Sequence, residues 1–391
     1  MENILPTYYK PVVSIDDPVV DVAHWDKAVD AFDEKKFKEA VLEVINYMNA
    51  NVLKDVDTTG DIEITEYQGS AQINIHIDDK KFRIKAPFLK ITGQTNQVAL
   101  LRKIAEINFS AMTLAQITKH DNRLCFEYEM PIELSQPNKL YDLLWEVSVN
   151  ADKYDDLLIN NFKADFVEKP QKKDLTSEER EEVKRQMKAL FTDFEKIYKQ
   201  FIDKRLESYK WELSALSLLK LSNMPYVHGQ LRTDLIDEIS HIFNGDIPMD
   251  YRADKAFKYL KKLMQKSDDE IFENIYHARQ FVSLRMRSSE DIIAERLKNY
   301  TKTVETNRQK ERFMYQYYYL KIIFHKLIYD YNLEKNYLDA IQDTLVSVNG
   351  QDYEEAVPVL EDLYFKMLNK ELTKKEIKTE KKGGFFSNLF H

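Results

Sequence analysis

The residues of this chain that could carry out chemistry are few and scattered. The 8 histidines form no H-E-x-x-H pattern, in which two histidines one helical turn apart bind zinc. The single cysteine, Cys125, alternates with apolar residues on a predicted strand, and a catalytic thiol needs a histidine partner that the sequence does not place. We therefore expect structural histidines, an inert thiol and no intramolecular disulfide.

Neighbouring carboxylates are the other candidates for chemistry. Asp155-Asp156 and Asp268-Asp269-Glu270 could bind a cation, but adjacent residues on a helix point to different faces. A solvated surface or a helix cap explains them more simply. The chain has only 8 glycines, no glycine-rich phosphate loop and no G-x-S-x-G nucleophile motif. The sequence thus predicts no catalytic residue, no metal site and no cofactor, and we expect a non-enzymatic protein.

The strongest functional signal is an apolar group that follows a lysine-rich spacer. Residues 370–382 read as a charged tether, and two glycines separate it from the apolar tip. The predicted partner-binding residues are Lys381, Lys382, Phe385, Phe386, Leu389 and Phe390. Ordering this segment offsets most of what burying its side chains would gain, so we expect a preformed groove or several tails acting together. A partner protein, a membrane or the chain's own helical half could receive the tip.

Charge and hydropathy narrow the class of partner. The net charge of −9 resides in residues 1–168, while the remainder is close to neutral. An acidic half argues against nucleic acid as its ligand and suits a basic or amphipathic polypeptide, although a solvated acidic surface is the commoner explanation. No signal-peptide pattern and no run of 18 apolar residues occurs. We expect a cytoplasmic protein, and peripheral contact of the tail with the inner face of the membrane is one of the open alternatives.

Residues 23–168 have the hydrophobic periodicity of an α+β domain. Helical spacing between His24 and Asn51 gives way after Gly60 to alternation with a period of two. The predicted order is α-βββ-α-ββ-α, with helices at 97–109 and about 137–162. Turns of two or so residues between the strands predict an antiparallel sheet with one apolar and one polar face.

This order and length of elements resembles the type III secretion chaperone-like fold, which YbjN-type bacterial regulators share. The resemblance covers about residues 23–166 and rests on the order of elements, since no signature motif is present. It implies a small, acidic, dimeric domain that binds extended segments of client proteins. The large helical extension departs from that family, so client secretion is not implied for this chain.

Residues 177–369 are predicted to be all helical, after an extended lead-in at 1–22 and a linker at 169–176. Thr176-Ser177-Glu178-Glu179 has the spacing of a capping box. Residues 183–201 carry a heptad seam in a helix that we expect to run on to Leu221. Further helices are expected at 231–243, 253–264, 270–286, 291–331 and in two shorter stretches up to Leu368. The apolar run 314–331, rich in tyrosine, should form the centre of the core.

Together these patterns favour a non-enzymatic adaptor or chaperone-like protein. The α+β domain would bind a polypeptide through its sheet edge or polar face, and the tail at residues 370–391 would recruit the protein. Two alternatives stay open. One is a structural scaffold that dimerises along residues 183–201. The other is an enzyme or regulator with a site in the helical half, which a pocket of converging titratable groups would indicate.

Overall fold

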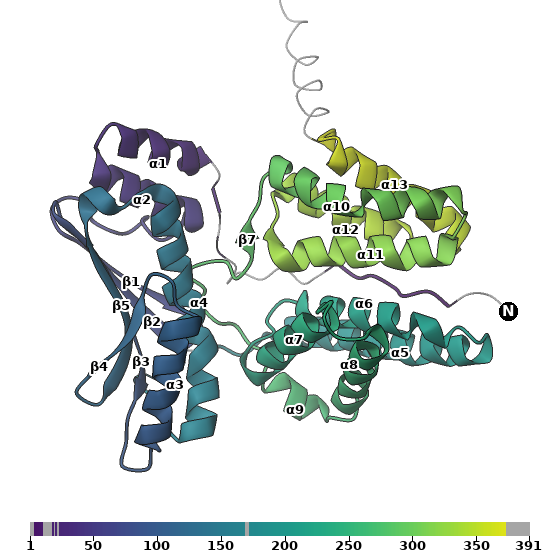
Figure 1. Cartoon of the computed structure of the whole chain (residues 1–391), viewed down its shortest axis with the longest axis horizontal. Helices are drawn as coiled ribbons and strands as arrows, with labels where there is room; N and C mark the ends of the chain where they lie inside the picture. The colour runs from purple at the N-terminus through teal and green to yellow at the C-terminus, as the bar shows by residue number, and fades with distance from the viewer. Residues whose placement is uncertain (1–3, 11–17, 19, 22, 169–171, 373–391) are drawn as a thin grey trace, which may run out of the picture.

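The computed structural model describes residues 4–10, 18, 20–21, 23–168 and 172–372. An antiparallel sheet with its helices forms the N-terminal half, and helices form the rest, as predicted (Figure 1). The elements of the N-terminal half are α1 (Ala23–Asp33), α2 (Phe37–Met48), β1 (Ile62–Gln68), β2 (Ala71–Ile77), β3 (Lys81–Lys90), α3 (Gln97–Ser110), β4 (Gln116–His120), β5 (Arg123–Pro131), the 3₁₀ turn η1 (Ile132–Leu134), α4 (Pro137–Phe162) and β6 (Asp165–Phe166).

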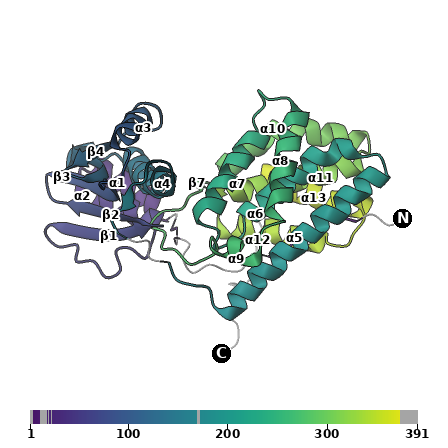
Figure 2. The ribbon, with the colours of Figure 1, turned by 90° about the horizontal axis from the view of Figure 1, so that it is seen from below.

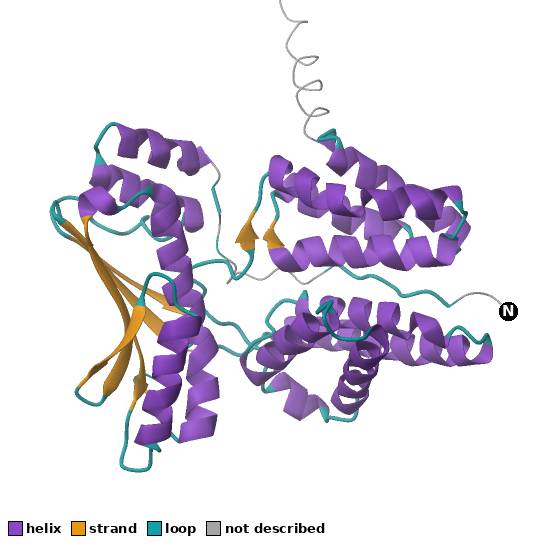
Figure 3. Ribbon diagram, viewed as in Figure 1, coloured by secondary structure: helices purple, strands orange, loops and turns teal. Residues whose placement is uncertain are grey.

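The sheet has the strand order β1-β2-β3-β5-β4, with β6 beside β3 (Figure 3). β2 buries every second residue along its whole length, and β1 and β3 do so along most of theirs, as the period of two predicts. The buried face packs against α4, and α2 packs on α4 in turn. On the other face, charges pair across the strands, with Glu129 accepting from both Lys81 and Arg83. Opposite charges on this polar face thus pair with one another.

Different groups cover the two edges of the sheet. At the β4 edge, Asn108 of α3 bonds both main-chain groups of Ile117, donating to its oxygen at 2.9 Å and accepting from its nitrogen at 2.8 Å. A strand could not pair there without displacing Asn108. At the end of β1, Gly69 N–H donates to the oxygen of Arg279 at 2.9 Å, and Gln68 pairs with Gln280. A segment of the helical half therefore covers this part of the β1 edge.

The helical half forms two layers in Figure 1, with α5 to α9 below and α10 to α13 above. Its elements are α5 (Ser177–Asp203), the 3₁₀ turn η2 (Glu207–Tyr209), α6 (Lys210–Ser222), α7 (Gly229–Ile242), α8 (Met249–Leu263), α9 (Asp268–Phe272), β7 (Met286–Arg287), α10 (Glu290–Gln309), α11 (Phe313–Asp330), β8 (Tyr331–Asn332), α12 (Lys335–Ser347) and α13 (Tyr353–Leu368). The capping box predicted at Thr176 and Glu179 is present. As expected, α11 is buried along most of its length, Tyr317 and Tyr318 included.

The heptad seam of α5 is buried inside the chain itself. Val183, Leu190 and Ile197 belong to the core that α5 shares with α6 and α11. The dimer seam predicted for residues 183–201 is therefore unavailable in this fold, because the same side chains already pack intramolecularly.

Three of the predicted helices are wrong in extent. The helix expected to reach Leu221 ends at Asp203, where Arg205 takes a left-handed backbone with φ of 56°. The helix expected at 291–331 breaks in the same way at Glu311, with φ of 49°. Of the helix expected at 270–286, only residues 270–272 are helical, at the end of α9.

The rest of that stretch is extended because the α+β half holds it. Phe281 and Val282 are fully buried among the core residues of the sheet and α4. Trp145 of α4 donates to the oxygen of Ser283 at 3.0 Å, and Asn49 donates to the oxygen of Phe281 at 3.2 Å. Figure 2 shows the two halves side by side with β7 between them. Tertiary contacts here override the helical spacing of the sequence.

Candidate functional site

Residues 4–10 cross the helical half as an extended strand, which we call the N-terminal strap. In Figure 1 the strap passes between the layer of α6 and the layer of α11. Pro6 and Tyr8 are buried there, and Tyr8 belongs to the helical core. The strap makes no helix or sheet bonds of its own, so its main-chain groups must find partners elsewhere.

Side chains of α5 and of the turn after α12 accept hydrogen bonds from three main-chain nitrogens of the strap. Ile4 N–H donates to Gln200 at 3.2 Å, and Thr7 N–H donates to the carboxylate of Asp193 at 2.8 Å. Tyr8 N–H donates to Asn349 Oδ1 at 2.9 Å, and Asn349 Nδ2 donates back to the oxygen of Tyr8 at 2.8 Å. Asn349 thereby pairs with an extended main chain through two hydrogen bonds, as a neighbouring strand would.

The carbonyl oxygens of the strap receive two lysines. Lys321 Nζ donates to the oxygen of Pro6 at 3.0 Å, and Lys220 Nζ donates to the oxygen of Thr7. Lys321 is 1% exposed, an unusual position for a lysine. Gln186 adds a bond to the oxygen of Lys10 at 2.9 Å. Without the strap, these donors would face a groove between the helical layers.

Three strap side chains also make specific contacts. The buried ring of Tyr8 lies 5.3 Å from the ring of His325, measured between centroids. The guanidinium of Arg185 lies 4.7 Å from the centre of the Tyr9 ring, and Lys10 pairs with Asp343. These contacts add some side-chain preference to a groove that mainly recognises backbone.

Burial sets the charge state of this groove. Desolvation lowers the pKa of Lys220 to about 8, with the nearby Asp193 opposing the shift. Desolvation also holds the pKa of Lys321 well below its usual value, and Lys220 adds to that effect. The pKa of His325 is likewise depressed by burial and by both lysines, so its imidazole is neutral near pH 7. The groove therefore favours neutral or electron-rich groups such as peptide carbonyls.

The groove holds the main chain of residues 4–10, and its imidazole is buried beside that segment. His325, its one imidazole, is 1% exposed and forms no hydrogen bond with any described residue. A general base must lie within hydrogen-bonding reach of the proton that it removes, and among the described residues His325 has no such partner. What the groove offers instead is a ladder of donors and acceptors spaced along an extended chain.

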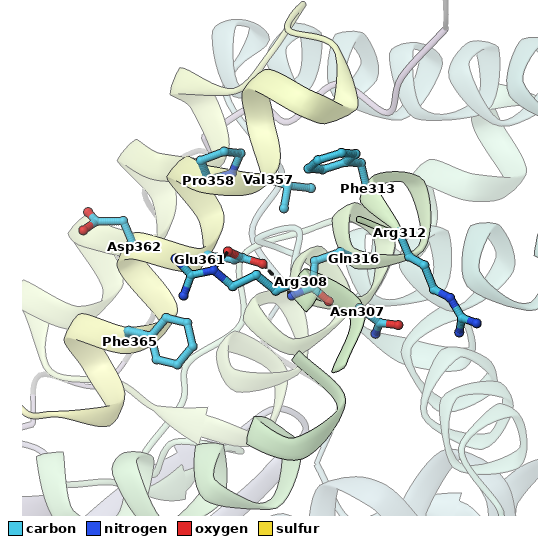
Figure 4. Close-up of a pocket in the computed structure, with 10 residues that line it drawn as sticks. All are labelled: Asn307, Arg308, Arg312, Phe313, Gln316, Val357, Pro358, Glu361, Asp362 and Phe365. Atoms are coloured by element: carbon cyan, nitrogen blue, oxygen red, sulfur yellow. Dashed lines mark hydrogen bonds and ion pairs between the residues drawn. The ribbon is translucent and has the colours of Figure 1, made fainter. Parts of the chain in front are cut away.

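A second hollow lies between α10, α11 and α13 (Figure 4). It has a volume of about 370 Å³. Glu361 accepts from Gln316 through one carboxylate oxygen at 2.9 Å and pairs with Arg308 through the other at 3.3 Å. Both oxygens are engaged, so the carboxylate is not free to act as a base. No serine, cysteine, histidine or lysine lines this pocket within the described part of the chain.

The partner-binding residues predicted in the tail lie outside the described residues and stay a prediction. They are Lys381, Lys382, Phe385, Phe386, Leu389 and Phe390. Cys125 is buried, and desolvation raises its pKa to about 11, so the thiol is protonated at neutral pH. Asp268 and Glu270 begin α9, where Glu270 closes a capping box with Ser267, so this acidic run caps a helix as expected. Asp155 is buried in the middle of α4, so the expectation of a solvated surface or a helix cap is wrong for this residue.

Neither a metal centre nor a spanning helix is found in the described ranges. There, no three His, Cys, Asp or Glu side chains are grouped to hold a metal ion. Among the same residues, no helix combines the length and the hydropathy needed to cross a bilayer.

Sequence reasoning missed the groove because its residues are far apart in the chain. The contacts of the strap join residues 176 to 341 positions apart. One signal was available: Lys321 interrupts the apolar run of α11, and a lysine in a buried run needs a buried acceptor. No protein-family model and no curated protein sequence matches this chain.

Proposed function

We propose that this protein is an adaptor or chaperone-like protein whose helical groove binds an extended polypeptide segment. The observation that carries the proposal is the strap itself. Seven polar contacts go to its main chain, from five helical side chains (Gln186, Asp193, Gln200, Lys220 and Lys321) and from Asn349 in the turn after α12. Contacts of this kind accept many sequences, because every residue offers the same main-chain groups.

The extended segment held by the α+β half supports the same function. Residues 279–283 are also bound through their main chain, by Gly69, Asn49 and Trp145. Both halves therefore bind extended peptide, and each holds a piece of this chain. In the proposal the two sites differ in role. Phe281 and Val282 are part of the α+β core, whereas the strap precedes α1 and, in the proposal, exchanges with a partner segment.

The strap is then a competitor for the groove. A partner segment binds only when the strap has left, so the apparent affinity falls by the fraction of chains with an open groove. The partner is an extended segment with a proline or small residue and, two positions later, an aromatic residue that fills the place of Tyr8. The predicted likeness of residues 23–166 to client-binding chaperones agrees with this function, and recruitment through residues 383–390 would be a separate step.

The test uses the full chain and a labelled peptide with the sequence of residues 4–10. Replacing a buried aromatic residue by alanine costs about 3–5 kcal/mol, so Tyr8→Ala should free the groove. The peptide should then bind the variant roughly 100-fold more tightly than the wild type, as measured by fluorescence anisotropy. Tyr251→Ala is the matched control, because Tyr251 is 75% exposed. Equal binding to all three proteins, with the Tyr8→Ala chain still folded, would refute the proposal.

A further inference from the structure

A small polar pocket lies where the two halves meet, distant in sequence from the strap. We call it the junction pocket. The β1–β2 turn contributes Gly69, α4 contributes Asp152 and Lys153, and the start of α7 contributes His228 and Gly229. Its volume is about 40 Å³. That is room for a group the size of a few water molecules.

The first turn of α7 presents main-chain donors at this pocket. His228 is the N-cap residue and its side chain makes no capping bond. Leu231 N–H donates to Asn274 at 3.3 Å, but the N–H groups of Gly229 and Gln230 meet no acceptor among the described residues. Gly229 has φ of 55°, a backbone that favours glycine, and a Cβ there would lie 2.9 Å from Asn274 Oδ1. The α7 helix has 14 residues, so its N-terminus carries a substantial positive end.

The buried imidazole of His228 is a second and independent sign of a ligand. The residue is 6% exposed and lines the pocket, yet its ring forms no hydrogen bond with any residue that the structure describes. Its only ring contact there is a stack on Tyr276, with centroids 4.9 Å apart. The ring lines the pocket, so a bound acceptor there would give it a hydrogen-bonding partner.

The charges around the pocket are mainly positive. Arg232 pairs with Asp152 at 3.0 Å, which neutralises the one acidic side chain that lines it. Lys153 also lines the pocket, and Lys172 lies with its ammonium 4.3 Å from the centre of the Tyr276 ring. Neither lysine pairs with a carboxylate of a described residue. Burial and then the nearby Arg232 and Lys172 lower the pKa of His228 to about 3, which fits a site of positive potential.

We propose that the junction pocket binds the phosphate group of a small molecule. The pocket offers several hydrogen-bond donors. They are the N–H groups of Gly229 and Gln230, the neutral imidazole of His228, and the ammonium groups of Lys153 and Lys172, which pair with no carboxylate of a described residue. They require several acceptor oxygens at once. A phosphate group offers these in a tetrahedral arrangement, whereas a carboxylate offers only two oxygens and a halide offers none. The ligand therefore sits across both halves of the protein and contacts each.

The test is a titration of the full-length protein with sodium phosphate at constant ionic strength, using chloride as the reference anion. Calorimetry gives the affinity, and the amide signals of Gly229 and Gln230 in nuclear magnetic resonance spectra give the location. Lys172→Gln removes one exposed cation and should weaken binding at least about fivefold. Lys196→Gln is the matched control, because Lys196 is an exposed residue of α5.

His228→Phe is the second variant, since it keeps the stack on Tyr276 and removes the imidazole donor. It should also lose affinity, and the Lys172→Gln result decides the matter if His228→Phe does not fold. Ribose 5-phosphate binding more tightly than inorganic phosphate indicates a phosphorylated metabolite, and equal binding indicates free phosphate; both support the site. Equal affinities of the Lys172→Gln and Lys196→Gln proteins, or no shift of the two amide signals, would overturn it.

Discussion

Asn349→Ala should release the N-terminal strap while leaving the helical core folded. Asn349 makes both hydrogen bonds to the main chain of Tyr8, at 2.9 and 2.8 Å. Its loss removes two bonds worth about 1 kcal/mol each and leaves a partly buried N–H and C=O of Tyr8 unpaired. We expect strap docking to weaken by about 2–4 kcal/mol, which is a factor of roughly 30 to 1,000 in the opening equilibrium.

Hydrogen–deuterium exchange read by mass spectrometry measures this opening directly. The amides of Thr7 and Tyr8 should exchange faster by that factor, because both are hydrogen-bonded only through the docked strap. Peptides from α11 should change much less, since its core contacts remain.

The chain provides its own matched control at the edge of the sheet. Asn108 makes the same pair of bonds to the main chain of Ile117, at 2.9 and 2.8 Å. Asn108→Ala should speed exchange at β4 and leave the strap unchanged. If Asn349→Ala leaves exchange in residues 4–10 unaltered, or if the wild-type strap already exchanges like a free peptide, the docked strap is not what holds the groove closed.

Three further predictions follow from single contacts. Burial lowers the pKa of Lys220 from 10.5 to about 8, so between pH 8 and 10.5 the folded chain binds fewer protons than the unfolded chain. The unfolding free energy measured in urea should therefore rise by about 1–2 kcal/mol from pH 8 to pH 10. Lys220→Met should abolish that rise. Gly69→Ala places a Cβ 1.6 Å from Asp152 Oδ1 at a left-handed backbone and should cost more than about 2 kcal/mol in urea unfolding, whereas Gly93→Ala, with open space around it, should be nearly neutral. The pKa of Glu179 is lowered to about 2, chiefly by the hydrogen bond that it accepts from the main chain of Thr176 in the capping box. The wild type should therefore lose unfolding free energy as the pH falls from about 4.5 to 2. Glu179→Gln should make stability depend less on pH in this range.

Much of the fold can be predicted from the sequence, wherever local pattern and tertiary packing favour the same structure. The alternation at Ile73, Ile75 and Ile77 predicts a half-buried strand, and all three side chains are buried. The capping box at Thr176 and Glu179 predicts where α5 begins, because its bonds lie within four residues. Such signals are local, so one sequence is enough to detect them.

The places where prediction fails are those where distant contacts decide. Residues 270–286 have helical spacing, but burial of Phe281 and Val282 in the other half favours an extended chain. The strap has no periodicity at all, since side chains such as Asp193 and Asn349 supply its hydrogen bonds from far along the chain. Local sequence pattern therefore could not predict the groove. It could not predict the junction pocket either, because residues of α4 and α7 line that pocket together.

The binding of an extended segment in the helical groove is the central claim, and a photo-crosslink tests it most directly. A peptide of residues 4–10 carrying a benzophenone group in place of the Tyr8 side chain would be added to the full-length Tyr8→Ala protein, and the crosslinked residues would be identified by mass spectrometry. Crosslinks to α6 and α11 around Asn223 and His325 are predicted, because these residues surround the Tyr8 ring. Crosslinks confined to the β1 edge of the sheet, or none above the level seen with a scrambled peptide, would contradict the account.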